Sequence, residues 1–224
     1  MNKSNLEDLS IRFKKHEDPE RAFQMKKYMK DRYPFFGIQA NPRRAICSQF
    51  LKDYGFPDKK VLFEMVKLLW EKDEREFQYF GAELANKFKN NIEENDLEIF
   101  QWMIVNKSWW DTVDFIAANL VGSYFKLYDQ HIGQIMKEWL DSGNIWLQRT
   151  TLIFQLKYRE KTDVELLTRQ ILALKDSKEF FIRKAIGWAL REYSKTNPDW
   201  VREFVGKTAM SGLSTREALK RIKE

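Results

Sequence analysis

Two residues one helical turn apart, Trp110 and Asp114, have the types and the spacing of a cation-binding site. They fall in "NKSWWDTVDFIAANLVG" (residues 106–122), which otherwise has the pattern of a buried helix face. Residues four apart share one face of a helix. The face of an aromatic ring attracts positive charge, and a fixed carboxylate adds a coulombic attraction. The pair could therefore hold a lysine, an organic cation, or a positive charge that develops only in a transition state.

Each of the two residues also has a purely structural interpretation. Trp110 could be the aromatic anchor of a helical repeat, packed in the core. Asp114 could form a salt bridge to a neighbouring helix, because an unpaired buried carboxylate is costly and needs either a partner or a task. On these residues alone, both interpretations stay open.

The elements that carry these residues are predicted to be helices. In "VLFEMVKLLW" (residues 61–70) the apolar residues recur with the period of one helix face, and no window shows the sustained alternation that predicts a strand. A capping residue or a proline marks a helix start at four places: Asp18-Pro19, Asn41-Pro42, Pro57-Asp58 and Asn197-Pro198. We therefore predict an all-α chain of roughly a dozen helices with short links.

An internal repeat is visible when four aromatic residues are placed in one column: Phe77, Trp110, Trp146 and Phe181. Their spacings of 33, 36 and 35 residues suit a helix pair of the HEAT type, and the tetratricopeptide signature is absent. The column four residues on contains Gly81, Asp114, Thr150 and Ala185, and the column seven on contains Leu84, Ala117, Ile153 and Trp188. Asp114 and Trp188 depart from their columns. Because equivalent helices of a stacked array line one surface, the two could converge on one site.

Basic residues in the last two repeats are candidates for contacts with phosphate. They are Arg149, Lys157, Arg159, Arg183, Lys184 and Arg191. Arg149 follows the Trp146 position by three residues and is expected near the surface that carries Asp114. It could track phosphates, or it could pair with a neighbouring acid, Asp114 included. The whole set could equally be a solvated face, and Trp188 could be a core residue.

The composition excludes several function classes. With one cysteine, Cys47, no intrachain disulfide can form, which fits a reducing compartment. The two histidines, His16 and His131, are too few for the usual zinc sites, so we expect no metal. The sequence also lacks the phosphate-loop, dinucleotide-binding, serine-hydrolase and zinc-deaminase motifs.

Length and charge point to a soluble helical protein with a polyanionic partner. The 224 residues are 43% hydrophobic and 32% charged, and we expect a single domain over residues 1–224. The amino terminus is polar, and no apolar run approaches the ~18 residues that a membrane span needs. Residues 1–142 hold 22 Lys and Arg against 23 Asp and Glu, whereas residues 143–224 hold 17 against 10, a net +7. Such an excess is typical of nucleic-acid binding, and a solvated basic surface is the alternative.

Long blocks of the sequence resemble the HEAT-like repeat DNA alkylation repair family, the AlkD type of bacterial alkylpurine DNA glycosylase. The blocks are "PERAFQMKKYMKDRYPFFGIQ", "NKSWWDTVD", "NIWLQRTTLIFQLKY", "SKEFFIRKAIGWALREYSKTNPD" and "LSTREALKRI". The resemblance runs the whole length. It implies a right-handed superhelical solenoid of helix pairs with a concave face that binds DNA.

The resemblance also implies roles for individual residues. The family's catalytic Trp, Asp and Trp fall on Trp110, Asp114 and Trp188. Its phosphate-contacting arginine falls on Arg149, and residues near the lesion fall on Tyr28 and Gln39. From the basic set, Lys157 and Arg191 are further candidates for contacts with DNA.

The implied activity is that of a monofunctional glycosylase, which hydrolyses the N-glycosidic bond of cationic N3- and N7-alkylated purines in base excision repair. We expect the partner to be double-stranded DNA that contains alkylated purines. We expect no cofactor and no membrane, and a cytoplasmic, nucleoid-associated monomer. One alternative is a DNA-binding relative without activity; such relatives differ in the amino-terminal helices, and residues 19–39 are intact here. The other is a protein-interaction solenoid.

Overall fold

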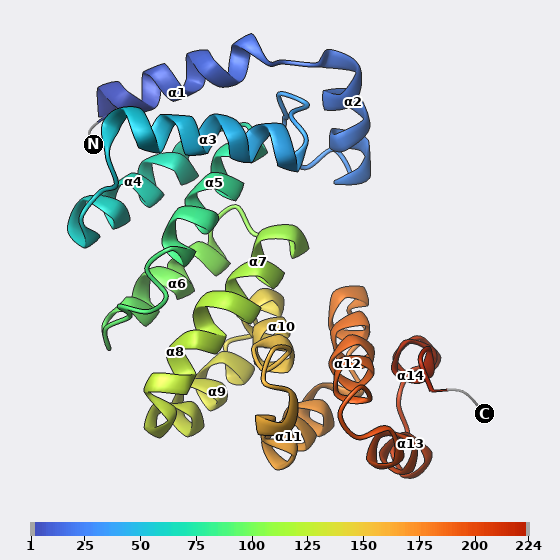
Figure 1. Cartoon of the computed structure of the whole chain (residues 1–224). Helices are drawn as coiled ribbons and strands as arrows, with labels where there is room; N and C mark the ends of the chain where they lie inside the picture. The colour runs from blue at the N-terminus through green and yellow to red at the C-terminus, as the bar shows by residue number, and fades with distance from the viewer. Residues whose placement is uncertain (1–2, 223–224) are drawn as a thin grey trace. The chain divides into compact units, whose positions relative to one another are not determined.

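Every regular element in the described part of the chain is helical. The computed structural model describes residues 3–222, and no strand occurs among them (Figure 1). The all-α class predicted from the sequence is confirmed. The chain divides into two compact units, residues 1–91 and 92–224, so one domain over residues 1–224 stays a prediction. In residues 3–222 no helix is long and apolar enough to cross a membrane.

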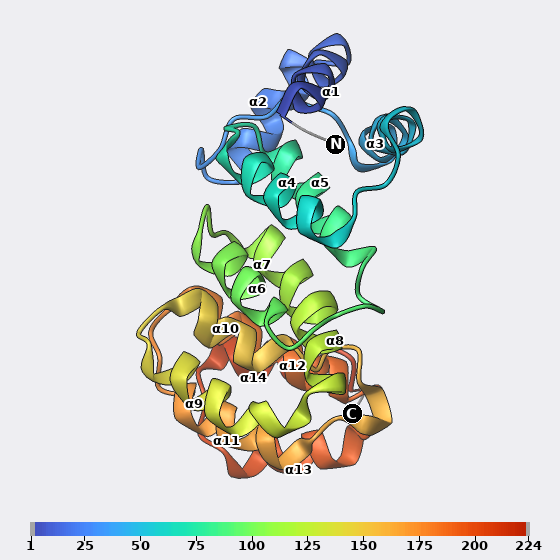
Figure 2. The same cartoon turned by 90° about the vertical axis from the view of Figure 1, so that its left-hand side faces the viewer.

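The first unit contains five α-helices: α1 (Lys3–Lys15), α2 (Pro19–Tyr28), α3 (Ala40–Tyr54), α4 (Lys59–Glu71) and α5 (Arg75–Asn86). Helices α4 and α5 lie side by side (Figure 2), because Gly81 lets α5 approach closely: a Cβ there would lie 2.9 Å from the ring of Trp70. Three aromatic rings pack together: Phe13 of α1, Phe36 of the segment that precedes α3, and Phe77 of α5. Their centroids are 5.1 to 5.8 Å apart. Aromatic packing therefore links these three segments in the core of the unit.

Helix α3 contains the cysteine of the chain. Cys47 is 4% exposed, and burial raises the pKa of its thiol to about 12. The thiolate is therefore nearly absent at neutral pH.

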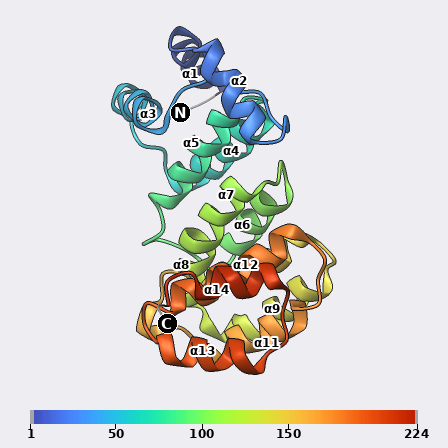
Figure 3. The same cartoon turned by 90° about the vertical axis from the view of Figure 1, so that its right-hand side faces the viewer.

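The second unit contains the remaining elements. They are α6 (Asp96–Val105), α7 (Trp110–Ile116), the π-helix η1 (Ala117–Val121), α8 (Gly122–Leu127), η2 (Asp129–His131), α9 (Ile132–Asp141), α10 (Ile145–Ile153), η3 (Arg159–Lys161), α11 (Val164–Leu174), α12 (Phe180–Tyr193), α13 (Pro198–Lys207) and α14 (Gly212–Leu219). Helices α12 and α14 pack side by side (Figure 3). A Cβ on Gly187 would lie 2.4 Å from the Cβ of Glu217, so only glycine permits this approach.

The predicted repeat corresponds to helix pairs. The columns lie on α5, α7, α10 and α12, and α4 with α5, α6 with α7, and α9 with α10 pack against each other. Three of the four predicted helix starts are confirmed, because Asp18, Asp58 and Asn197 accept hydrogen bonds from backbone N–H groups three residues on. At the fourth a helix also opens, with Pro42 in its first turn, but Asn41 is not its cap: α3 begins at Ala40 with Gln39 as the cap residue.

Candidate functional site

Asp114 and Arg149 form a two-bond ion pair between α7 and α10. Arg149 donates from Nε to Asp114 Oδ1 at 2.7 Å and from Nη2 to Oδ2 at 2.8 Å. The Arg149 side chain is 5% exposed and the Asp114 side chain is 15% exposed. Parallel bonds of this kind fix the plane of the carboxylate as well as its place. The salt bridge considered for Asp114 is thus present, and its partner is Arg149.

The same guanidinium reaches a third helix. Arg149 donates from Nη1 to the backbone carbonyl of Phe181 at 2.5 Å, near the start of α12. Its central carbon lies 6.0 Å from the centroid of the Trp188 ring, one to two turns further along α12. The structure therefore brings together Asp114, Arg149 and Trp188. Trp110 opens α7, one turn before Asp114.

Burial dominates the electrostatics of Asp114. Loss of water around the carboxyl raises its pKa above the usual value, the hydrogen bonds and charge of Arg149 oppose the shift, and the charge of Asp111 adds to it. The carboxylate is thus only partly compensated by its arginine. A site of this kind attracts a second cation that can approach from the exposed edge.

The buried aromatic anchor of α7 is Trp109. Its ring centroid lies 5.6 Å from that of Trp146 and 4.9 Å from that of Phe181, and it is 6% exposed. Of the two adjacent tryptophans, the structure thus gives the contact with Trp146 and Phe181 to Trp109 and not to Trp110, which the sequence alignment placed in their column. Trp110 is only half-buried, in contrast to Trp109.

The two further basic candidates are held by side chains of the second unit. Lys157, which is exposed, donates to Asn119 Oδ1 at 2.5 Å. Arg191 donates to Glu217 on α14, which also accepts from Lys184 at 2.9 Å. Lys184 and then Arg191 lower the pKa of Glu217. Sequence reasoning missed Glu217, since no local pattern links it to residues some thirty positions away.

Tyr28 and Gln39 both lie exposed in the first unit. Tyr28 ends α2 and is 70% exposed, and Gln39 is the cap residue of α3. Below Tyr28 is an apolar hollow of ≈ 270 Å³, whose lining includes Met25, Phe35 and Tyr79. Neither residue is part of the buried core of the unit.

The net positive charge, which lies in residues 143–224 when the sequence is divided at residue 142, lies mostly in the first unit when the chain is divided into its two structural units. Residues 1–91 hold 19 Lys and Arg against 14 Asp and Glu, a net +5, whereas residues 92–224 hold 20 against 19. The excess in residues 143–224 is offset by residues 92–142, which carry 3 against 9 and belong to the same unit. The charge that could attract a polyanion is therefore concentrated in the first unit.

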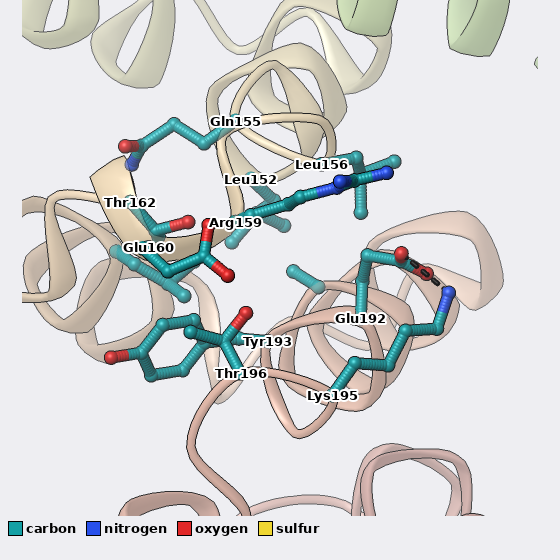
Figure 4. A pocket seen from close by; sticks show the side chains of 12 residues that line it. Leu152, Gln155, Leu156, Arg159, Glu160, Thr162, Glu192, Tyr193, Lys195 and Thr196 are labelled. Atoms are coloured by element: carbon teal, nitrogen blue, oxygen red, sulfur yellow. Dashed lines mark hydrogen bonds and ion pairs between the residues drawn. The ribbon is translucent and has the colours of Figure 1, made fainter.

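A cavity of ≈ 300 Å³ lies elsewhere in the second unit, between η3, α11 and the end of α12 (Figure 4). Leu152, Leu156, Leu167 and Ala189 form its apolar lining, and charged side chains such as Glu192 surround them. Of the basic candidates for phosphate contact, Arg159 lines it. In the described part of the chain, no cluster of three or more His, Cys, Asp or Glu could hold a metal ion.

Comparisons with known proteins agree on one family. The profile of the family described as DNA alkylation repair enzyme matches residues 9–222, across both units. A search of curated proteins found no match.

Solved structures give the same answer. A protein from Enterococcus faecalis, described as a predicted DNA alkylation repair enzyme, is 36% identical with a TM-score of 0.86, over 93% of this chain and 97% of that one. AlkD2 from Streptococcus mutans is 20% identical with a TM-score of 0.62, over 84% of this chain and 93% of that one, which shows a shared fold.

Proposed function

Because the chain belongs to the DNA alkylation repair enzyme family, we propose that it is a monofunctional DNA glycosylase. Its substrates are cationic N3- and N7-alkylated purines in duplex DNA, which it releases by hydrolysis of the N-glycosidic bond in base excision repair. The observation that carries the proposal is the largely buried Asp114 carboxylate, which is oriented by Arg149, whose guanidinium also lies 6.0 Å from the Trp188 ring.

The chemistry of the substrate explains why this small site is sufficient. An N-alkylated purine already carries a positive charge, so it leaves readily and needs no strong general acid. The barrier then lies in the sugar, which acquires positive charge as the bond to the base breaks. Asp114 stabilises that charge and positions the attacking water. The ring faces of Trp110 and Trp188 hold the deoxyribose.

Arg149 has two tasks in this proposal. Its three hydrogen bonds to Asp114 and Phe181 use three of its five N–H groups and hold the carboxylate in one orientation. The remaining two donate to a phosphate beside the damaged nucleotide. Tyr28 and Gln39 contact the DNA near the lesion, and Lys157 and Arg191 contact its backbone.

The direct test is an excision assay. Duplex DNA treated with a methylating agent is incubated with the purified protein, and released N7-methylguanine and N3-methyladenine are measured by chromatography. The same duplex incubated without protein corrects for spontaneous loss of the labile bases. The proposal requires release well above that background, and wild-type protein that releases no more than the protein-free duplex would refute it.

A DNA-binding relative without activity is the second candidate, and the net +5 charge of the first unit is equally compatible with it. This candidate predicts duplex affinity without base release. A protein-interaction solenoid predicts neither. A steep loss of duplex affinity between ~50 and ~200 mM salt, with a smaller slope in Arg149→Ala, separates the two DNA-binding candidates from the protein-binding one.

A further inference from the structure

Helix α2 has little packing of its own to hold it in place. None of its ten residues is buried, and Phe23 and Tyr28 are 63% and 70% exposed. Helices in proteins are stabilised mainly by the packing of an apolar face. The position of α2, and with it Tyr28, therefore depends on how its ends are attached to the first unit.

The start of α2 is attached to the segment before α3. Asp18, the cap residue of α2, donates its backbone N–H to the carbonyl of Phe36 at 2.8 Å. Gly37 follows with φ +87°, and a Cβ there would lie 2.2 Å from the carbonyl oxygen of Asp18 and 2.7 Å from the backbone nitrogen of Ala22. The two backbones touch with no room for a side chain, so residues 36–38 determine where α2 begins.

Glu76 on α5 holds this segment in turn. Its side chain is fully buried, and it accepts hydrogen bonds from three successive backbone N–H groups: Phe36 at 3.2 Å, Gly37 at 3.0 Å and Ile38 at 3.1 Å. The neighbouring Arg75 donates its backbone N–H to the carbonyl of Pro34 at 3.0 Å. Residues 34–38 are thus fixed to the first turn of α5, and Gln39 is the next residue along the chain.

We infer that Glu76 is a positioning residue, which fixes α2 and the start of α3 so that Tyr28 and Gln39 meet the lesion. The expected effect on excision rests on the proposed glycosylase function. The hydrogen bonds that connect Glu76 to residues 36–38 do not depend on that function. Burial makes this carboxylate costly, and the charge-assisted bonds to three amides offset the cost. An acid in this place stabilises one backbone conformation forty residues away in sequence.

The chemistry requires a carboxylate here and not an amide. Glu76 Oε1 accepts from Gly37 and Ile38, and Oε2 accepts from Phe36. Glutamine has one acceptor oxygen, so its NH₂ group would face at least one backbone N–H. That leaves a buried donor without a partner and releases part of the segment.

The test compares Glu76→Gln with Gly37→Ala, which disturbs the same contact without changing any charge. The matched control is Glu83→Gln, an acid of the same helix that pairs with Arg43 and Arg44. Hydrogen exchange of the amides of residues 36–38 reports the segment directly. Labelling of buried Cys47 by a thiol reagent reports whether the first unit as a whole has opened.

In both test variants we expect exchange at residues 36–38 to rise about tenfold or more while Cys47 stays protected. Single-turnover excision should fall about tenfold or more, with affinity for undamaged duplex within about threefold of wild type. The control should match wild type in all four measurements. Unchanged exchange, unchanged excision, or equal loss in Glu83→Gln would overturn the inference. If the wild type shows no excision, the proposed function fails, while the exchange experiment still decides whether Glu76 fixes the segment.

Discussion

Each unit of the molecule holds a carboxylate away from water, and the two are neutralised in different ways. Glu76 in the first unit is fully buried among three backbone N–H groups. Asp114 in the second is 15% exposed and faces one guanidinium. In both cases burial raises the pKa of the carboxyl, opposed by backbone hydrogen bonds for Glu76 and by Arg149 for Asp114.

Because of this difference, Glu76 is suited to fix a backbone conformation, whereas Asp114 is suited to interact with a ligand. Amides of the backbone cannot leave Glu76 without a change of fold, so its negative charge is committed to the segment before α3. Arg149 is a side chain, and an exposed edge of Asp114 remains beside it. A positive charge on a ligand can therefore interact with Asp114 without disturbing the backbone.

The largest expected effect is on excision when Asp114 loses its charge. Asp114→Asn keeps the shape of the side chain and removes its charge, so excision should fall about a hundredfold to a thousandfold, as when one well-placed stabilising group is lost. Duplex affinity should persist. Single-turnover release of N7-methylguanine measures the first quantity and a fluorescence titration the second.

The control for this experiment is Asp111→Asn, the same change three residues earlier in the first turn of α7. It should stay within a few-fold of wild type. If Asp114→Asn were as active as this control, Asp114 would be a structural carboxylate like Glu76.

Removing the cation should be the next largest effect. Arg149→Met leaves the Asp114 carboxylate largely buried without its partner, so the free energy of unfolding should fall by about 3–5 kcal/mol. Adding Asp114→Asn should restore part of that loss, because the double variant no longer contains the unpaired charge. Urea denaturation measures both.

Arg202→Met is the control for this pair. Arg202 bonds to Asp199 at 2.6 Å, but the two side chains are 54% and 86% exposed, so its loss should cost under about 0.5 kcal/mol. If Arg149→Met and Arg202→Met lowered the free energy of unfolding equally, the Asp114–Arg149 pair would stabilise the fold no more than an exposed ion pair does.

Acid should affect excision and stability in opposite directions. Since burial raises the pKa of Asp114, its carboxylate takes up a proton above the usual aspartate range of ~3.9. Excision needs the charged form and should fall as pH drops through that raised pKa. The folded chain binds this proton before the unfolded chain does, so wild type should gain stability over Asp114→Asn in the same window.

Excision rates and denaturant unfolding of both proteins, measured from pH 7 to pH 4, check this prediction. A stability difference that moves the other way would show that Arg149 outweighs burial and lowers the pKa of Asp114.

The smallest effect concerns a third carboxylate, Glu217, whose pKa is lowered by Lys184 and Arg191. Glu217→Gln frees these two cations, so duplex affinity should rise a few-fold and the salt slope should steepen by about one to two. The cost in stability at pH 7 should stay under about 1 kcal/mol. Because the folded pKa is lowered, that cost should disappear as pH falls through it. Titrations at several salt concentrations measure the slope.

Glu192→Gln, which frees the exposed Lys195 just beyond the end of α12, is the matched control. If duplex affinity falls with added salt as steeply in both variants as in the wild type, Arg191 does not contact DNA.

Local patterns in the sequence were sufficient for the elements and for the exceptional residues. The period of residues 61–70 places Leu62, Met65, Val66 and Leu69 on the buried face of α4. Asp114 stands out because its columns otherwise hold small residues, and Thr150 and Ala185 are fully buried. Both inferences need only neighbours on one helix or a count along the chain.

Contacts between distant residues could not be predicted in this way. Glu76 in "REFQYFGAEL" has no feature that marks it as the acceptor for amides forty residues earlier. Arg149 was expected either at a phosphate or at an acid, and only its distance to Asp114 identifies the acid. The burial of Trp109 and not Trp110 against Trp146 and Phe181 could not be predicted, because the two neighbours have the same residue type.

The burial of Cys47 has a consequence for survival of the protein under the stress that creates its proposed substrate. Methylating agents that damage purines also attack thiolates, the reactive form of cysteine. With a pKa of about 12 and 4% exposure, the thiol is both protonated and shielded. At neutral pH the chain therefore offers such electrophiles no ready thiolate at its one cysteine.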